Sequence, residues 1–278
     1  MQIGIFAKTF AGSNARHVLQ AVHNAGYDVA QFNFACVGLL SMPDEIPPST
    51  IEAITSASFT TGVGLAAVSG TYNMAHPDPF VRDDGLRRLS HMIASAKDVG
   101  TRLITLCTGT RDPDDQWRHH PDNGSPDAWR DLTAGLEKAL TTAEQHGVDL
   151  GIEPELGNVV ASPDLARKLI GDMASRRLKI VLDPANLFEQ APAATIKSII
   201  DHAIDLLADR IVMAHAKDRC ADGSVCAAGA GVIDFVHFVG ALHRAGFDGP
   251  LVTHGLNEAE AVPVATVLRR ILAEAATA

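Results

Sequence analysis

The chain has 278 residues, 46% of them hydrophobic and 20% charged, which is the balance of a globular protein with a sizeable core rather than of a disordered chain. Its formal net charge of -10 at pH 7 disfavours general affinity for nucleic acids or anionic membranes and favours a small-molecule partner. The four cysteines form no CxxC pair, no apolar run approaches the roughly 20 residues of a membrane span, and the first residues lack the pattern of a signal peptide. We therefore expect a cytoplasmic protein with no nucleic-acid and no membrane partner.

Eight short apolar segments alternate with helix-length amphipathic segments, which is the pattern of βα units around a parallel sheet. Most of these short segments are apolar on both faces, as strands covered by helices are. The predicted strands are residues 2–6, 28–34, 64–69, 102–108, 148–153, 178–183, 210–216 and 250–254.

The predicted helices carry start and stop signals. Ser125 and Ser162 each precede a proline, so each serine is expected to cap the first turn of a helix. Four glycines stand shortly before a strand, where a helix end commonly needs a left-handed residue: Gly26, Gly100, Gly147 and Gly246. Because no linker or composition shift interrupts the pattern, residues 1–278 are predicted to form a single α/β domain, a closed (β/α)8 TIM barrel, with a doubly wound open sheet as the alternative.

Four consecutive predicted strands, the fifth to the eighth, end in residue types that bind metals. In such a barrel the reacting groups come from the C-terminal strand ends, so these four side chains are expected at one rim. Taken singly, each is more often an ordinary loop, core or surface residue. Together, two carboxylates and two imidazoles suit Mn²⁺, Zn²⁺, Fe²⁺ or Co²⁺ better than Ca²⁺ or Mg²⁺. The predicted ligands of one divalent metal ion are Glu153, Asp183, His215 and His254.

Several motifs in the second half of the chain resemble those of a known family. They are GIEPE at 151–155, IVLDPANLF at 180–188, HAKD at 215–218 and the segment 229–252. With these motifs in this order, essentially the whole chain resembles the xylose isomerase-like TIM-barrel superfamily, often labelled sugar phosphate isomerase/epimerase. The resemblance implies that Glu153, Asp183 and His215 correspond to metal ligands, and that the protein forms a homo-oligomer.

Two positions depart from the pattern of the epimerase-like members. Their eighth strand usually ends in a glutamate that binds metal and serves as the second catalytic base, whereas this chain has His254. Their sixth strand is often followed three residues later by histidine, whereas this chain has Asn186. Histidine still binds metals, so the metal site remains an expectation, but the two-glutamate proton shuttle does not carry over.

The chemistry expected at this rim begins with removal of a proton from the carbon next to a substrate carbonyl. A divalent ion bound to that carbonyl stabilises the resulting enediolate by several kcal/mol. A base within hydrogen-bonding reach of the proton increases the rate by roughly 10²–10⁴-fold. The candidate catalytic residues are Glu153, if one of its oxygens stays free of the metal, Glu155 and His254. Glu155 is equally open to a structural pairing with an arginine.

Polar residues just after strands or in long loops are candidates for substrate contacts. The long loop after the fourth predicted strand offers a tryptophan whose flat face suits a sugar ring, although it could also pack on its own helix. The run 217–219 is equally typical of a solvated salt-bridge cluster. The predicted substrate-binding residues are Asn186, Trp117, His120, Lys217, Arg219 and His76.

The leading hypothesis is a divalent-metal-dependent isomerase or epimerase of a sugar, keto sugar or polyol. A lyase or dehydratase acting on a keto sugar or inosose begins with the same proton abstraction, so the sequence does not separate the two. An endonuclease is disfavoured because the first two predicted strands end near Lys8 and Asn33 rather than in further metal ligands. A non-catalytic sugar-binding barrel, in which His254 and Asn186 mark lost catalysis, is the alternative from a different class.

Overall fold

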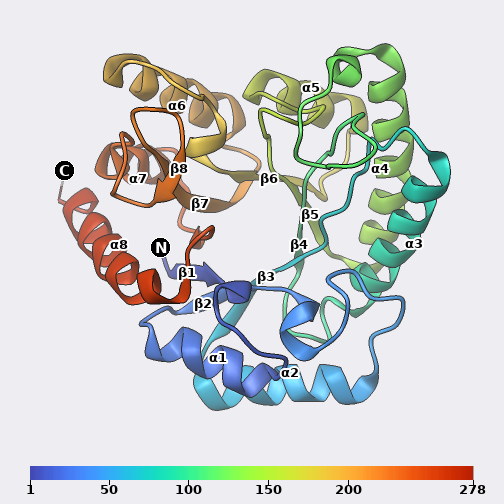
Figure 1. The fold of residues 1–278 in the computed structure, drawn as a ribbon, viewed down its shortest axis with the longest axis horizontal. Helices are drawn as coiled ribbons and strands as arrows, with labels where there is room; N and C mark the ends of the chain where they lie inside the picture. The colour runs from blue at the N-terminus through green and yellow to red at the C-terminus, as the bar shows by residue number, and fades with distance from the viewer. Residues whose placement is uncertain (278) are drawn as a thin grey trace.

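The computed structural model describes residues 1–277, and its centre is a ring of parallel strands enclosed by helices (Figure 1). β1 pairs with β2 on one side and with β9 on the other, and β7 pairs with both β6 and β9, so the ring is closed. The ring consists of β1 (Ile3–Phe6), β2 (Val29–Phe32), β3 (Gly64–Ser69), β4 (Leu103–Leu106), β5 (Asp149–Ile152), β6 (Leu178–Leu182), β7 (Ile211–Arg219) and β9 (Leu251–Thr253). This arrangement confirms the predicted single-domain (β/α)8 barrel and excludes the open sheet.

One helix follows each barrel strand and covers the outside of the ring (Figure 1). The helices are α1 (Ala15–Asn24), α2 (Pro48–Thr61), α3 (Pro79–Ser95), α4 (Pro126–His146), α5 (Pro163–Met173), α6 (Ala193–Leu207), α7 (Phe235–Arg244) and α8 (Ala261–Ala275). Short 3-10 turns lie at Ala7–Thr9, Phe34–Val37, Pro121–Gly124, Pro184–Asn186 and Glu258–Glu260.

The predicted helix signals are confirmed. Ser125 accepts a hydrogen bond from the backbone N–H of Ala128, and Ser162 from that of Leu165, so both serines cap their helices. All four junction glycines adopt positive φ, between 63° at Gly147 and 100° at Gly100. These turns return the chain to the N-terminal end of the next strand.

One strand was not predicted. β7 continues past the predicted end at residue 216 to Arg219, where it pairs in antiparallel fashion with β8 (Val225–Ala227). The structure thus has one strand more than the eight that were predicted. The turn around Gly223, at φ 89°, joins β7 and β8 into a hairpin.

The hydrophobic core has two layers. The larger lies between the ring and the helices. The smaller one fills the inside of the ring with one side chain from each of five strands: Ala67, Leu103, Val181, Met213 and Val252. At Gly151 a Cβ atom would lie 2.9 Å from Val181 Cγ2, so glycine is the residue that this narrow interior admits.

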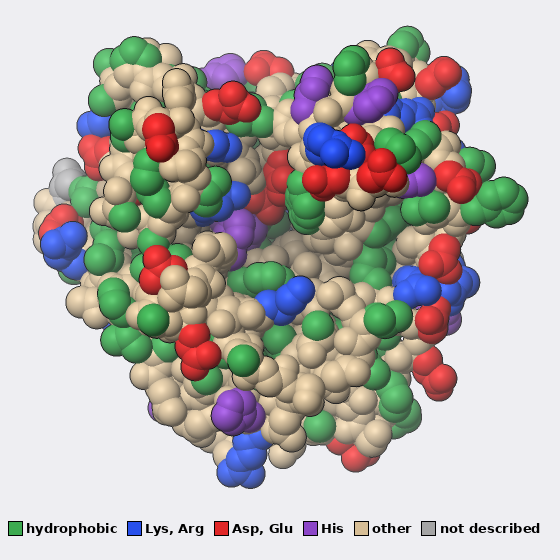
Figure 2. Space-filling model, in the orientation of Figure 1, with side chains coloured by type: hydrophobic (Ala, Val, Ile, Leu, Met, Phe, Trp, Pro, Cys, Tyr) green, Lys and Arg blue, Asp and Glu red, His purple; other side chains and the backbone are tan. Residues whose placement is uncertain are grey.

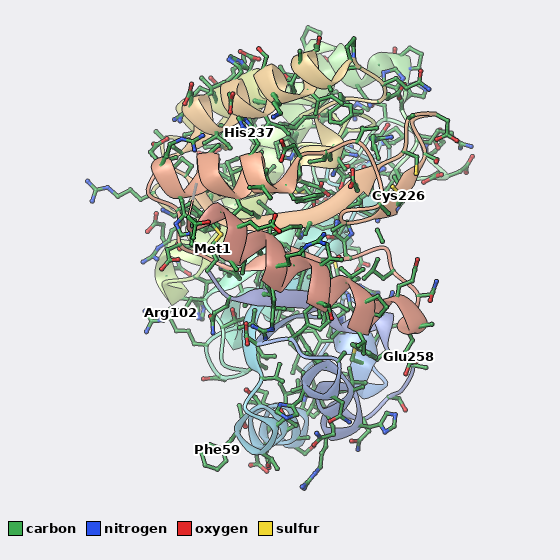
Figure 3. The ribbon with its side chains drawn as sticks, turned by 90° about the vertical axis from the view of Figure 1, so that its left-hand side faces the viewer. Met1, Phe59, Arg102, Cys226, His237 and Glu258 are labelled. Carbon is green, nitrogen blue, oxygen red and sulfur yellow. The ribbon has the colours of Figure 1, made fainter. Side chains whose placement is uncertain are left out.

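The two ends of the barrel differ in what they carry. Met1 and Arg102, which precede β1 and β4, lie at one end, whereas Cys226 and Glu258, which follow β7 and β9, lie at the other (Figure 3). The second end is the C-terminal rim, where the predicted site residues are expected. Within residues 1–277, no helix has the length and apolar character needed to cross a membrane.

Candidate functional site

The four predicted metal ligands lie together at the C-terminal rim. Glu153, Asp183 and His254 are the first residues after β5, β6 and β9, and His215 belongs to β7. Because side chains alternate along a strand, a residue two positions after an inward-facing one also faces inward. Val181, Met213 and Val252 stand two positions before three of the four ligands and pack inside the barrel. The strand pattern therefore directs the ligand side chains to the barrel axis.

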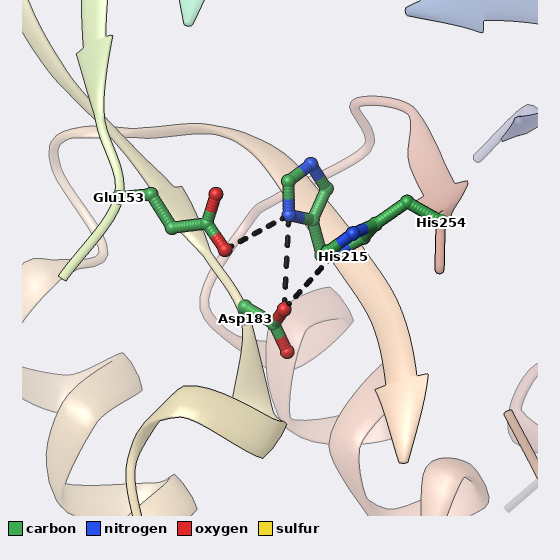
Figure 4. A group of neighbouring side chains, drawn as sticks. All are labelled: Glu153, Asp183, His215 and His254. Carbon is green, nitrogen blue, oxygen red and sulfur yellow. Dashed lines mark hydrogen bonds and ion pairs between the residues drawn. The ribbon is translucent and has the colours of Figure 1, made fainter. Parts of the chain in front are cut away.

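Each of the four side chains offers one ligand atom, and these atoms all lie within 4.8 Å of one another (Figure 4). His215 Nδ1 lies 3.1 Å from Glu153 Oε1 and 3.8 Å from Asp183 Oδ2. His254 Nε2 lies 3.1 Å from Asp183 Oδ2, and the centroids of the two imidazole rings are 4.4 Å apart. The group could therefore hold a metal ion.

Lys217 and Asn186 are hydrogen-bonded to the ligand group. Lys217 Nζ donates to Asn186 Oδ1 at 2.8 Å and lies 2.8 Å from Asp183 Oδ2. Asn186 Nδ2 donates to Glu153 Oε1 at 2.8 Å, and Asp183 Oδ1 accepts from the backbone N–H of Ala185. The sequence presented these two residues as substrate contacts, but their polar atoms bind the ligand carboxylates.

Glu153 and Glu155 have pKa values above the usual value of a glutamate side chain. Burial raises the pKa of Glu153 to about 7, and the nearby Asp183 carboxylate contributes to the rise. Burial also raises the pKa of Glu155 to about 8, with a further contribution from Glu153. Both shifts mean that these two carboxyl groups retain a proton to a higher pH than exposed glutamates do.

The other members of the group keep their ordinary charge states near pH 7. Burial favours the neutral acid at Asp183, but Lys217 and the two histidines outweigh it and hold the pKa of Asp183 well below its usual range. Burial lowers the pKa of His215 to about 4. Burial and the neighbouring His215 also lower the pKa of His254. Both imidazoles are therefore neutral near pH 7 and have lone pairs for a metal or a proton.

The charges of the site fit a divalent cation. Glu153, Glu155 and Asp183 bring three carboxylates, and within residues 1–277 their only ion pair with lysine or arginine is the one between Asp183 and Lys217. When all three acids are ionised, two negative charges remain without a balancing cation. A divalent ion restores neutrality, and the mixed oxygen and nitrogen donors suit Mn²⁺, Fe²⁺, Co²⁺ or Zn²⁺.

A pocket of about 360 Å³ opens above this group on the C-terminal rim. Figure 2 shows a hollow near the centre of this face, with acidic and histidine side chains in its wall. The lining includes Glu153, Glu155, His215, His254, Gln31 and Trp117. The pocket is large enough for a small polar ligand such as a monosaccharide.

Glu155 and Trp117 both line this pocket. No hydrogen bond or ion pair of the Glu155 carboxylate occurs among the described residues, so the expected alternative of an arginine partner is not realised. Trp117 is 50% exposed and lines the pocket rather than being covered by a helix. Lys8, which also lines the pocket, has no ion-pair partner in residues 1–277.

Three predicted substrate contacts lie elsewhere. The ring of His76 binds Pro113 O and the backbone N–H of Asp78, and that of His120 caps the 3-10 turn at Pro121–Gly124. Arg219 donates to Ala185 O and Gly223 O and anchors the hairpin. Each of these three side chains is hydrogen-bonded to nearby backbone, and none of the three lines the pocket.

Sequence reasoning missed Gln31 and Thr105, which lie inside the barrel next to His215. Gln31 Oε1 is 3.0 Å from His215 Nε2, and Gln31 Nε2 donates to Thr105 Oγ1 at 3.0 Å. The available signal was a glutamine within the otherwise apolar strand β2. Such a residue needs a buried partner, but its sequence neighbours do not identify that partner.

A larger hollow of about 700 Å³ lies at the opposite end of the barrel, where Lys97, Thr101 and Arg102 are among its lining residues. It contains none of the predicted site residues. Reacting groups of TIM barrels lie at the C-terminal face, so the smaller pocket is the candidate site.

Comparison with known proteins agrees with this architecture. The sequence matches the family described as xylose isomerase-like TIM barrel over residues 19–271, and no curated protein matches it. The structure is similar to that of an L-ribulose 3-epimerase, with 20% identity, a TM-score of 0.75 and coverage of 99% of this chain and 96% of that chain. It is also similar to a 3-keto-D-glucoside 4-epimerase from E. coli, with 18% identity, a TM-score of 0.75 and coverage of 100% of both chains.

A third similar structure is a D-psicose 3-epimerase with D-tagatose from Clostridium cellulolyticum H10, with 17% identity, a TM-score of 0.74 and coverage of 98% of this chain and 99% of that chain. At such identities a structural likeness establishes a shared fold. The family match covers most of the sequence, and the closed ring of eight parallel strands agrees with it. The chain therefore belongs to the xylose isomerase-like TIM barrel family.

Proposed function

We propose that the protein is a divalent-metal-dependent isomerase or epimerase of a sugar, keto sugar or polyol. One observation carries the proposal: four potential ligands from four consecutive barrel strands converge within 4.8 Å beneath a polar pocket. The similar structures named as L-ribulose 3-epimerase, 3-keto-D-glucoside 4-epimerase and D-psicose 3-epimerase support the same class of substrate.

In this proposal Glu153, Asp183, His215 and His254 hold one Mn²⁺, Fe²⁺, Co²⁺ or Zn²⁺ ion. The bound ion supplies Lewis-acid polarisation of the substrate carbonyl. Lys217 keeps Asp183 ionised through their direct ion pair, and Asn186 orients Glu153 through its amide. Both residues thus position the ligands.

Glu155 is the proposed proton-transfer residue. Its carboxyl lines the pocket, lies near Glu153 and is not engaged by another side chain in the described part of the chain. The pKa of about 8 that burial gives it in the metal-free protein places it near the range in which an acid and its conjugate base interconvert. His254 lines the pocket as well, and it is the second proton-transfer residue in the arrangement in which Glu153, Asp183 and His215 hold the ion and the lone pair of His254 stays free.

Trp117 completes the proposed substrate site. Its exposed ring lines the pocket and offers an apolar face against which the C–H groups of a sugar can pack. With the ligand group at the base and the indole in the wall, the pocket holds the reacting carbon near Glu155 and His254.

The experiment is solvent exchange. Protein reconstituted with Mn²⁺, Co²⁺ or Zn²⁺ is incubated in D₂O with a panel of keto sugars, and proton NMR follows loss of the C–H signal next to the carbonyl. We expect exchange by the wild type, a loss of at least about 100-fold in Glu155→Gln, and retention of metal in that variant. Binding of sugars with no exchange in any metal-loaded sample would establish the non-catalytic barrel instead.

The same spectra separate isomerisation from elimination. An isomerase or epimerase returns the proton and yields a product with the composition of the substrate. A lyase begins with the same exchange but releases water or another leaving group, so new vinylic or deoxy signals appear.

A further inference from the structure

The half of the barrel rim that carries no candidate metal ligand contributes one basic side chain to the pocket. The four ligands belong to or directly follow β5, β6, β7 and β9, whereas Lys8 follows β1 and Asn33 follows β2. Among the described residues that line the pocket, Lys8 is the only lysine or arginine. The pocket therefore has acids and imidazoles on one side and a single cation from the other half of the ring.

Lys8 lies close to the turn that follows β2. The 3-10 turn Ala7–Thr9, which carries Lys8, packs near the 3-10 turn Phe34–Val37. Burial raises the pKa of the Cys36 thiol to about 11, and the positive charge of Lys8 acts against this rise. The ammonium group is thus near the turn that Asn33 begins.

Asn33 presents an unused hydrogen-bond donor to the same pocket. Its Oδ1 accepts from the backbone N–H of Ala35 at 3.0 Å, which fixes the amide, and its side chain lines the pocket although the residue is only 4% exposed. In residues 1–277, Asn158 Nδ2 is the one fully enclosed side-chain atom without a partner, so Asn33 Nδ2, which forms no hydrogen bond either, is open to the pocket. Ser41 also lines the pocket, and its hydroxyl bonds to no described residue.

We infer that Lys8, Asn33 and Ser41 bind a carboxylate group of the substrate, which makes the substrate a keto sugar acid. This inference rests on the proposed function and names its substrate class. An ammonium, an amide NH₂ and a hydroxyl all donate hydrogen bonds, and a carboxylate accepts them through two oxygens.

The charges favour a carboxylate over a phosphate. With the proposed divalent ion bound, the three ionised acids and Lys217 are balanced, so Lys8 adds one positive charge to the pocket. One carboxylate neutralises that charge. A phosphate monoester carries about 1.5 to 2 negative charges at pH 7, and no second lysine or arginine occurs among the described lining residues to meet them.

The test compares ligands that differ only at the terminal carbon. One set is D-fructose, D-fructuronate and D-fructose 6-phosphate, and the second is D-tagatose, D-tagaturonate and D-tagatose 6-phosphate. Isothermal titration calorimetry with manganese-loaded protein gives the dissociation constants at low and high salt. In at least one set we expect the acid to bind about 10-fold more tightly than the neutral sugar and the phosphate, with a smaller preference at high salt.

Three variants assign the preference to this group of residues. Lys8→Met removes the charge and should reduce the preference for the acid by about 10-fold, whereas Lys8→Arg should retain it. Asn33→Asp keeps the oxygen that accepts from Ala35 but replaces the donor with a negative charge, so it should also weaken binding of the acid without loss of the fold. Lys97→Met is the matched control, because it removes the same charge at the opposite end of the barrel.

Acids that bind no more tightly than the neutral sugars would overturn the inference. So would a preference that stays within about threefold of wild type in both Lys8→Met and Asn33→Asp, since the carboxylate would then bind elsewhere, for example to the ion. A 6-phosphate that binds more tightly than the acid would overturn the assignment of a carboxylate.

Failure of the proposed function gives a different result. In that case the acids bind with the expected dependence on Lys8, but no ligand exchanges its C–H proton in D₂O. Exchange of neutral keto sugars without any preference for the acids supports the proposed function and removes only the carboxylate site.

Discussion

Lys217 contacts the most strongly buried carboxylate of the site. Its side chain is 11% exposed and that of Asp183 is 0% exposed, and Lys217 Nζ lies 2.8 Å from Asp183 Oδ2. Burial on its own lowers the pKa of Lys217, but Asp183 and Glu153 outweigh it and raise that pKa above the usual value. Removing one partner of a buried pair leaves the other charge without compensation, which is costlier than losing an exposed pair.

We predict that Lys217→Met lowers the free energy of unfolding of the metal-free protein by about 3–5 kcal/mol. Lys197→Met, which breaks the half-exposed pair with Asp234, should cost about 1 kcal/mol or less. Urea unfolding in the presence of a chelator measures both. Addition of a divalent ion should narrow the difference, because the ion compensates Asp183, and equal losses in the two variants would contradict this interpretation.

Glu155 gives the metal-free protein a pH-dependent stability. Its pKa of about 8 in the folded protein is above the ordinary value of 4.5, so the folded state binds more protons than the unfolded state between these limits. The stabilisation is complete below about pH 4.5 and is lost as the pH rises through about 8, with a slope of at most about 1.4 kcal/mol per pH unit.

Glu155→Gln is neutral at every pH and should therefore remove this part of the slope. Urea unfolding at pH 5, 6.5 and 8 without metal provides the comparison, with Glu137→Gln on the exposed face of α4 as the control. Parallel stability profiles for the wild type and Glu155→Gln would show that Glu155 is ionised in the folded protein throughout this range.

At the scale of elements, two loops must approach closely to form the pocket wall. Asn123 Nδ2 in the β4–α4 loop donates to Gly157 O in the β5–α5 loop at 2.8 Å. A Cβ atom on Gly157 would lie 2.3 Å from the backbone oxygen of Trp117. Gly157 is thus the position where a side chain would force apart the loop that carries Trp117 and the loop that follows Glu153.

We predict that Gly157→Ala lowers the free energy of unfolding by about 1–3 kcal/mol and weakens substrate binding, because the Trp117 backbone must move. Gly135→Ala is the contrasting variant. A Cβ at Gly135, inside α4, meets no atom within 4 Å, so alanine should stabilise the helix by about 0.5–1 kcal/mol. Thermal unfolding and ligand titration measure both effects, and a neutral Gly157→Ala would contradict the assigned contact.

Element by element, the sequence predicts what is local. The capping serines, the positive-φ glycines and the order of strands and helices depend on residues close in the chain, and the structure reproduces them. The hairpin of β7 and β8 was missed because its second strand, Val225–Ala227, is only three residues long and directly follows a turn. The sequence predicted His76 and His120 in the pocket because both belong to loops after barrel strands. In the structure their rings form hydrogen bonds with nearby backbone groups instead.

The candidate site is predictable to the extent that the barrel is. Once strands five to eight are known to be parallel neighbours, Glu153, Asp183, His215 and His254 must share one rim. The network of Gln31, Asn186 and Lys217 depends on which side chains meet across the ring. Such contacts join residues separated by as many as 184 positions, and no local pattern encodes them.

At the scale of the whole molecule, the barrel gathers the candidate metal ligands at its C-terminal rim and has its helices and larger core on the outside. An ion that binds only the folded state stabilises it, by about 2.7 kcal/mol at a concentration 100 times its dissociation constant. The protein as a whole is thus expected to be more stable with metal than without it. Whether it assembles into a homo-oligomer stays a prediction of the family resemblance.

The most direct test of the metal site is elemental mass spectrometry on untagged protein, for the wild type, Asp183→Ala and the exposed control Asp172→Ala. We predict one Mn, Fe, Co or Zn ion per chain in the wild type and in Asp172→Ala, and loss of the ion in Asp183→Ala, because Asp183 belongs to the ligand group and Asp172 does not. A wild type that takes up no divalent ion even after reconstitution, or an Asp183→Ala variant that retains it, would contradict the assignment of this site.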